Sequence, residues 1–167
     1  VAQPTEVDEL IVPGQGFGLG PITRGTQAFR DSIHARFGHD VEPEGPERLY
    51  LSRSALTGGK GGILGEKKLE AYLQAEGYEI FHPEKHSMRD QIARYKAARE
   101  VVAADGSAVH MFAMVGRPDQ KLAMIARRIS TVQSFLMDHV QYFCASEPLH
   151  IQAISKEWFR KRDGKNG

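Results

Sequence analysis

The feature that most constrains the fold is the stretch from Arg48 to Gly77, where an apolar run, a glycine-rich basic loop and a helical pattern follow one another. The apolar run at 49–51 is typical of a short buried strand. From Gly65 onward, apolar residues recur at helical spacing, and Gly77 stands where a helix commonly ends in a left-handed residue. Because strand, loop and helix form the repeating unit of α/β folds, this stretch predicts that fold class.

The loop that follows this strand is a candidate ligand site. Ligands of open α/β sheets bind beyond the carboxyl ends of the strands, where the amino terminus of a helix attracts phosphate. Arg53 and Lys60 would add positive charge there, and Ser54 lies beside them. Two interpretations remain open, a diphosphate-binding loop or a solvent-exposed loop with ordinary hydrated charges. The loop contains neither a P-loop pattern nor a G-x-G-x-x-G fingerprint.

Comparable patterns recur along the rest of the chain. They predict further strands at 10–12, 78–81, 100–104, 122–126 and 149–154, and helices at 26–37, 88–98, 108–115 and 131–143. Ser87 is a suitable N-cap for the helix at 88–98, with Asp90 completing a variant of the capping box. Strands that alternate with helices imply a mostly parallel sheet of about six strands in a Rossmann-like three-layer domain. We expect this domain to span 1–167, with 160–167 as a flexible tail.

Length and composition limit the classes of function. A chain of 167 residues fits one domain with a sizeable core. A formal net charge of +1 gives no general electrostatic reason to expect nucleic acid as a partner. Cys144 is the only cysteine, so no intramolecular disulfide can form, and a cytoplasmic location is favoured. No apolar run approaches the roughly 20 residues of a membrane span, and because the chain begins at Val1 we expect it to be part of a longer protein.

The best candidates for catalysis follow the predicted strand at 100–104. Asp105, Gly106 and Ser107 form the predicted turn, and His110 lies on the short helix after it. The ordinary pKa of histidine suits acid–base chemistry, so His110 either faces the cleft or is packed in the helical layer. His82 and His86 are separated by Pro83, which favours two loop histidines over a metal site.

A strand ending at Ser52 and Arg53, Glu66 at the start of the next helix, and Pro83 and Glu84 after the following strand form a pattern between Arg48 and Val115. In this pattern the sequence resembles glycosyltransferase family 61, also described as capsular-polysaccharide-biosynthesis-like. A strand that ends in Tyr-x-Ser-Arg matches the run from Tyr50 to Arg53. An Asn-Glu pair opens the next helix in the family, and here Glu66 matches while Gly65 replaces the asparagine. An arginine that the family often carries shortly before this pair is also missing, with glycines at 61 and 62.

The resemblance continues through the following elements. A Gly-hydrophobic strand that ends near Pro-Glu is matched by Gly77, Tyr78, Pro83 and Glu84, and a helix with an acidic-Gln pair and a late alanine is matched by Asp90, Gln91 and Ala98. The family then has a His-Gly-Ala turn before a short helix. Asp105 replaces that histidine here, which places a negative charge where a diphosphate is expected unless the carboxylate binds a ribose or acceptor hydroxyl.

The resemblance implies one half of a GT-B glycosyltransferase, the C-terminal domain that binds a nucleotide sugar donor without a metal or other cofactor. A saccharide acceptor and an N-terminal domain would be its partners. The ligand-binding residues that we expect are Arg53, Ser54, Lys60, Glu66, Gly106 and Ser107, of which Arg53, Glu66 and Gly106 match the family pattern. Asp105 and His110 are the only candidates for a catalytic role. The alternatives are a transferase-like module that binds but does not catalyse, and an unrelated α/β enzyme that acts on a phosphorylated metabolite.

Overall fold

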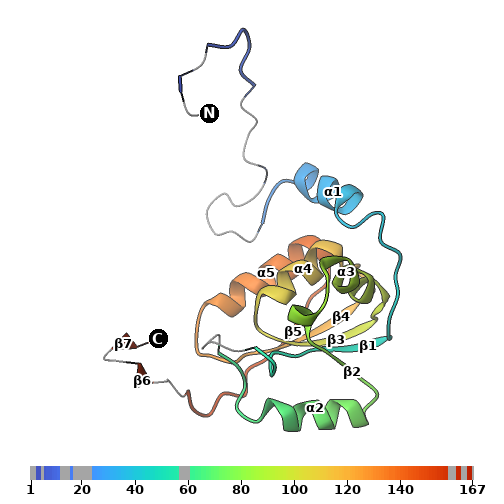
Figure 1. Cartoon of the computed structure of the whole chain (residues 1–167), viewed down its shortest axis with the longest axis vertical. Helices are drawn as coiled ribbons and strands as arrows, with labels where there is room; N and C mark the ends of the chain where they lie inside the picture. Colours follow the sequence, from blue (N-terminus) through green and yellow to red (C-terminus); the bar gives the residue numbers. More distant parts are fainter. Residues whose placement is uncertain are drawn as a thin grey trace.

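The central feature of the structure is an all-parallel, five-stranded sheet with strand order β2-β1-β3-β4-β5 (Figure 1). The structure is a computed structural model, and it describes residues 3–4, 6–11, 16, 24–56, 61–157, 161–162 and 165–166. The strands are β1 (Arg48–Leu51), β2 (Glu79–Phe81), β3 (Glu100–Ala104), β4 (Lys121–Ile125) and β5 (Leu149–Ile151). The predicted Rossmann-like α/β fold with a parallel sheet is therefore confirmed.

Helices lie on both faces of the sheet but are distributed unequally. They are α1 (Gln27–Arg36), α2 (Glu66–Ala75), the 3-10 helix η1 (Pro83–Lys85), α3 (Met88–Ala97), α4 (Ser107–Val115) and α5 (Val132–Cys144). Figure 1 shows α3, α4 and α5 on one face with α1 above them, and α2 on the opposite face. Within the described part of the chain, no helix combines the length and apolarity needed to cross a membrane. Near the C-terminus, the two short strands β6 (Lys161–Arg162) and β7 (Lys165–Asn166) pair antiparallel.

The local sequence explains where these helices begin and what they bury. Ser87 and Asp90 form the predicted capping box at the start of α3, with the Ser87 hydroxyl accepting the backbone N–H of Asp90 at 3.1 Å. Helix α4 carries no charged side chain, which suits its place between α3 and α5. Cys144 is fully buried at the end of α5, as expected.

Two predictions about strands are wrong. Leu10 and Ile11 belong to no strand and are 75% and 78% exposed, while Val12 lies outside the described residues. A short apolar run forms a strand only when a neighbouring strand pairs with its backbone, and no described strand pairs with this one. The last strand also ends at Ile151 rather than Ile154, so the sheet has five strands and not six.

The register shows that the two faces of the sheet differ in burial. On the face toward α3, α4 and α5, the adjacent residues Leu49, Val101 and Leu122 are all buried. On the face toward α2, the corresponding row runs from Tyr50 through Val102 and Ala123 to Leu149. Tyr50 is fully buried beneath α2, whereas Leu149 at the far end of the row is 63% exposed.

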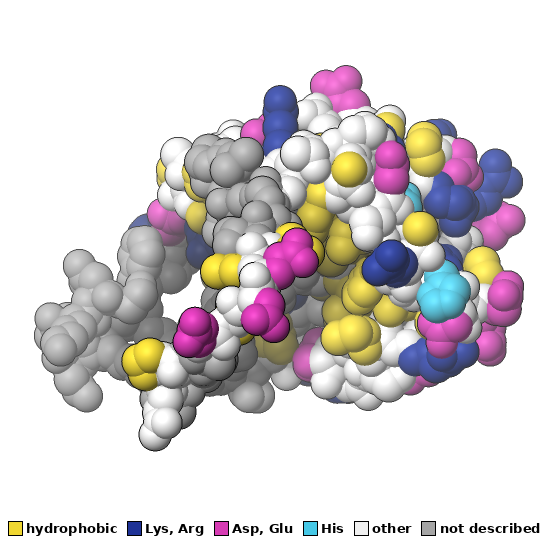
Figure 2. Space-filling model, turned by 90° about the horizontal axis from the view of Figure 1, so that it is seen from above, with side chains coloured by type: hydrophobic (Ala, Val, Ile, Leu, Met, Phe, Trp, Pro, Cys, Tyr) yellow, Lys and Arg dark blue, Asp and Glu magenta, His cyan; other side chains and the backbone are white. Residues whose placement is uncertain are grey.

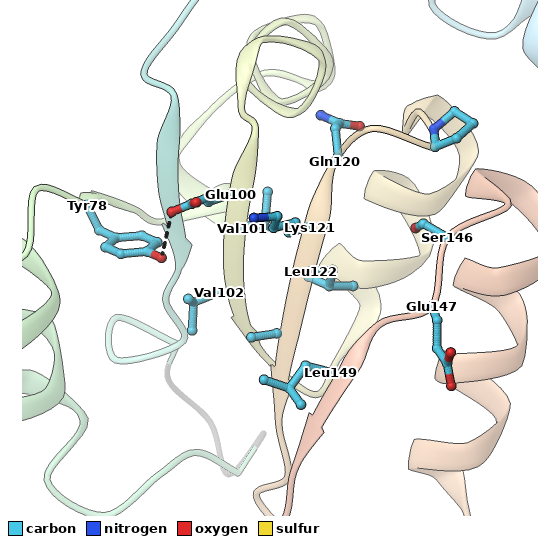
Figure 3. A pocket seen from close by; sticks show the side chains of 12 residues that line it. Tyr78, Glu100, Val101, Val102, Gln120, Lys121, Leu122, Ser146, Glu147 and Leu149 are labelled. Atoms are coloured by element: carbon cyan, nitrogen blue, oxygen red, sulfur yellow. Dashed lines mark hydrogen bonds between the residues drawn. The ribbon is translucent and has the colours of Figure 1, made fainter.

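A hollow of about 620 Å³ therefore lies over the part of the α2 face that α2 does not reach (Figure 3). Val102, Ala123 and Leu149 give it apolar walls, and the Tyr78 hydroxyl donates to Glu100 Oε2 at 3.5 Å along its border. The helical face also keeps apolar side chains at its surface (Figure 2). The partly buried apolar residues of α1, α4 and α5 that pack against the core include Phe29, Ile33, Phe37, Met111, Met114 and Met137.

Candidate functional site

The candidate site lies where the order of the strands reverses, at the carboxyl ends of β1 and β3. From β1 the chain first forms β2 on one side and then crosses to β3 on the other side, so these two strands flank the switch point. Ligands of sheets with this order bind at that point. Leu51 and Ala103 are neighbours in the register. The two candidate runs 52–54 and 105–107, far apart in sequence, therefore follow neighbouring strand ends.

Glu66 fixes the backbone on the β1 side of the site. Its side chain is only 4% exposed, and its Oε1 accepts the Arg53 backbone N–H at 2.8 Å and the Tyr50 hydroxyl at 2.9 Å. Ser52 Oγ lies 3.3 Å from the same oxygen. Burial, reinforced by this carboxylate, raises the pKa of the Tyr50 hydroxyl, which remains a donor. Glu66 therefore orients the residues that follow β1.

Ser54 is also directed toward α2. Its hydroxyl lies 2.5 Å from Glu70 Oε1, and its backbone N–H donates to Ser52 Oγ at 3.0 Å. Ser52 Oγ itself lies 2.6 Å from Glu70 Oε1. The side chain of Ser54 thus helps to hold the backbone after β1 against α2, while the side chain of Arg53 extends toward α4.

The Arg53 side chain crosses from β1 to the amino terminus of α4. A Cβ added to Gly106 would lie 2.5 Å from Arg53 Nη1, so the guanidinium occupies the space that a side chain at 106 would need. The φ of Gly106 is 166°, an extended conformation open to any residue, and space alone explains the glycine here. Gly106 caps α4 without a side-chain hydrogen bond. Arg53 therefore lies beside the positive end of the α4 dipole, a combination that attracts anions.

Asp105 is fully buried and forms an ion pair with Arg127. Arg127 Nε lies 2.5 Å from Asp105 Oδ1 and donates to the Asp105 carbonyl at 2.8 Å. Gln133 Nε2 donates to the other carboxylate oxygen, Oδ2, at 2.7 Å. These partners neutralise the negative charge that the sequence placed near the expected diphosphate. The geometry assigns Asp105 a positioning role below the surface of the site.

Two arginines that the sequence analysis missed belong to the same edge of the sheet. Arg127 and Arg128 directly follow β4. A Cβ on Gly61 would lie 2.6 Å from Arg127 Nη1, so this guanidinium packs against the backbone at Gly61, in the segment that precedes α2. Arg128 Nε is buried and has no hydrogen-bond partner among the residues that the structure describes. The sequence could have indicated both arginines, because residues that directly follow a parallel strand lie at the edge of the sheet where ligands bind.

We call Arg53, Arg127 and Arg128 the arginine cluster. Burial lowers the pKa of Arg53, and the charges of Arg127 and then Arg128 lower it further, while Asp105 and Glu66 oppose the change. Arg127 already pairs with Asp105, so an anion bound at the cluster would be attracted mainly by Arg53 and Arg128. The cluster is therefore suited to bind a phosphate group.

A pocket of about 240 Å³ opens beside Arg53. Leu51, Ser52 and Ala104 come from the ends of β1 and β3, and the first turn of α4 contributes Ser107 and Ala108. The remaining lining residues are Leu56, Pro83, Glu84, Gln91 and Met111. Ser107 is exposed at the mouth of the pocket, at the amino terminus of α4.

One candidate residue cannot be placed in this geometry, and another lies away from the pocket. Lys60, with the glycines at 58 and 59, lies outside the described residues. His110 lies at the contact between α4 and α5, where its ring centroid is 4.6 Å from that of His139, and burial lowers its pKa. It does not line the pocket beside Arg53, so its position supports the interpretation of a packed histidine.

Gly65 has a specific conformational role. It is the N-cap of α2 and has a φ of +78°, in the left-handed region, with no atom within 4 Å of a Cβ placed there. Glycine and asparagine are the residues that adopt this conformation most readily. The departure from the Asn-Glu pattern therefore preserves the backbone geometry that places Glu66.

The fold and this edge define a doubly wound α/β domain with a basic, phosphate-suited site at its switch point. The sequence model of the glycosyltransferase 61 family matches residues 2–122, and the chain belongs to that family. The match covers β1, α2, β2, α3, β3 and α4, which together build most of the site. No curated protein and no solved structure matches the chain.

Proposed function

We propose that this domain binds a nucleotide-activated sugar at the carboxyl ends of β1 and β3 and supplies the donor for transfer to a saccharide acceptor in polysaccharide biosynthesis. Membership of the glycosyltransferase 61 family supports the reaction class. The observation that carries the proposal is the Arg53 guanidinium, packed against Gly106 at the amino terminus of α4.

In this proposal the diphosphate lies between Arg53 and the first turn of α4. Transfer of the sugar to an acceptor hydroxyl breaks the bond between the anomeric carbon and the diphosphate oxygen, and negative charge develops on the leaving diphosphate. Arg53 and the α4 amides stabilise that charge at a site that folding has already organised. Ser107, exposed at the start of α4, offers a hydroxyl to the phosphate.

Gly65 and Asp105 depart from the family pattern, and both replacements favour the alternative of a module that binds but does not catalyse. Gly65 keeps the left-handed conformation at the start of α2, and Asp105 is neutralised by Arg127 below the site. Asp105 pairs with Arg127, and Arg53 remains beside the amino terminus of α4 as the positive charge for the diphosphate. The geometry therefore supports donor binding despite both replacements.

Binding is tested by thermal shift and calorimetric titration with nucleoside diphosphates and nucleotide sugars. A ligand that binds the folded state raises its stability by mass action. We expect one nucleotide class to stabilise the protein and Arg53→Ala to weaken its binding about tenfold or more, since a charge-assisted contact is lost. Arg89→Ala is the matched control, because Arg89 is 63% exposed and pairs with Asp40 elsewhere.

Gly106→Ala provides a second test that leaves every charge in place. The added methyl group would displace the Arg53 guanidinium, so binding should weaken while the fold is retained. If none of the nucleotides stabilises the wild-type chain, the proposal of a donor site in this chain is wrong.

A further inference from the structure

We infer that the 240 Å³ pocket beside Arg53 is a nucleobase site, with Glu84 as the acceptor for an N–H group of the base. The inference rests on the proposed function, because it assigns the part of the ligand that extends beyond the diphosphate. It follows from which surfaces of the pocket are apolar and which polar atoms already have partners.

Apolar surface makes up most of the pocket wall. Leu51 and Ala104, 1% and 3% exposed, form the floor at the strand ends. Leu56, Pro83, Ala108 and Met111 complete the apolar lining. A flat, weakly hydrated ring gains from contact with such a surface, whereas a sugar loses water from several hydroxyl groups.

The polar side chains of the wall are mostly engaged within the protein. Gln91 Nε2 donates to the carbonyls of Pro83 and His86 at 2.8 and 3.2 Å, and its Oε1 accepts the Tyr95 hydroxyl at 3.3 Å. Ser52 Oγ lies within hydrogen-bond distance of both Glu66 and Glu70. A sugar has several hydroxyl groups to satisfy in this pocket, whereas a base needs only one or two polar partners, which favours a base.

Glu84 differs from these residues. It lies in η1, its side chain is 28% exposed, and His82 Nδ1 lies 3.9 Å from its Oε1. That distance is too long for a hydrogen bond. The carboxylate can therefore accept an N–H from the edge of a base, and Arg53 and Ser107 at the same pocket place the phosphates next to it.

The test compares a nucleoside diphosphate with inorganic pyrophosphate on matched variants. Ala108→Leu adds bulk to the pocket wall from a partly exposed helical position. Ala71→Leu makes the same change on an exposed position of α2 outside the pocket lining and serves as control. Circular dichroism and the melting temperature establish that both variants are folded. The titrations use UDP, GDP, ADP and CDP with each protein.

We expect Ala108→Leu to weaken the best nucleoside diphosphate about tenfold while pyrophosphate binding changes by less than about twofold. Glu84→Gln should weaken the best nucleoside diphosphate more than pyrophosphate, because only the nucleotide carries an N–H group for the carboxylate to accept. Equal loss for pyrophosphate and nucleotide, or no loss in Ala108→Leu, overturns the nucleobase assignment.

The same titrations separate this inference from the proposed function. If Arg53→Ala leaves nucleotide binding intact while Ala108→Leu weakens it, the base site stands and the diphosphate position is wrong. If Arg53→Ala abolishes binding and Ala108→Leu has no effect, the diphosphate site stands and the base lies elsewhere. If neither pyrophosphate nor any nucleotide binds the wild-type protein, both are wrong.

Discussion

The carboxylate of Glu66 accepts the backbone N–H of Arg53 at 2.8 Å, which ties the first turn of α2 to the end of β1. The same oxygen accepts the Tyr50 hydroxyl, and the side chain is buried. One acidic residue thus connects the helix, the strand and the backbone of the arginine that we place at the diphosphate.

Replacement of Glu66 by glutamine should destabilise the protein by about 2–3 kcal/mol, because buried donors lose a charged acceptor and an amide N–H₂ is buried among them. Urea denaturation measures the free energy of unfolding. Glu76→Gln, at the exposed end of the same helix, should change it by less than about 0.5 kcal/mol. Equal effects of the two substitutions would contradict the role assigned to Glu66.

Loss of the ion pair between Asp105 and Arg127 should lower the free energy of unfolding more than Glu66→Gln does. Asp105→Asn leaves the Arg127 charge, 11% exposed, without its anion, and the expected cost is about 3–5 kcal/mol. Asp119→Asn is the control, because Asp119 is 60% exposed in its pair with Arg117 and its replacement should change the stability far less. Chemical denaturation of both variants checks the difference. A cost for Asp105→Asn as small as that of the control would show that the buried pair is not structural.

Because Gly65 has a left-handed conformation, we expect the protein to tolerate asparagine at this position better than alanine. Gly65→Ala should cost about 1–2 kcal/mol, because a Cβ disfavours a φ of +78°, whereas Gly65→Asn should cost clearly less. Gly62→Ala is the matched control, since the nearest atom to its Cβ would be 3.6 Å away. Thermal unfolding ranks the three variants. If Gly65→Asn is as destabilising as Gly65→Ala, the conformational explanation fails.

Sequence periodicity predicted the elements around the site because each of them carries its own local signal. The apolar run before Arg53, the helical spacing after Gly65 and the capping box at Ser87 all specify structure within a few residues. The strand predicted from the apolar run at Leu10 does not form, because a strand also needs a second strand to pair with. Such a partner lies far away in sequence, so local periodicity does not reveal it.

The candidate site was predicted less completely than the fold, since its chemistry depends on contacts between distant residues. Sequence placed Arg53 and Asp105 at strand ends, but only the fold shows that Asp105 faces Arg127 and Gln133 rather than a ligand. Arg127 and Arg128 were missed although they follow β4 directly. The rule that located Arg53, applied to every parallel strand, would have found them.

The buried histidine on α5 predicts a loss of stability in mild acid. His139 is 2% exposed, and burial, with a contribution from the neighbouring His110, lowers its pKa to about 4. An unfolded histidine titrates near 6.5, so between pH 6.5 and 4 the unfolded chain binds a proton that the folded protein does not. Stability is therefore complete above about pH 6.5 and falls on the order of 2–3 kcal/mol as the pH drops toward 4.

This pH dependence can be separated from that of the carboxylates by a variant without the ionisable ring. His139→Phe keeps an aromatic side chain beside Phe143 and should flatten the fall in stability between pH 6.5 and 4. His150→Gln, which removes an exposed histidine on β5, should leave that fall unchanged. Urea denaturation at several pH values measures both slopes. Parallel slopes for wild type and His139→Phe would show that His139 is not the group whose protonation opposes folding.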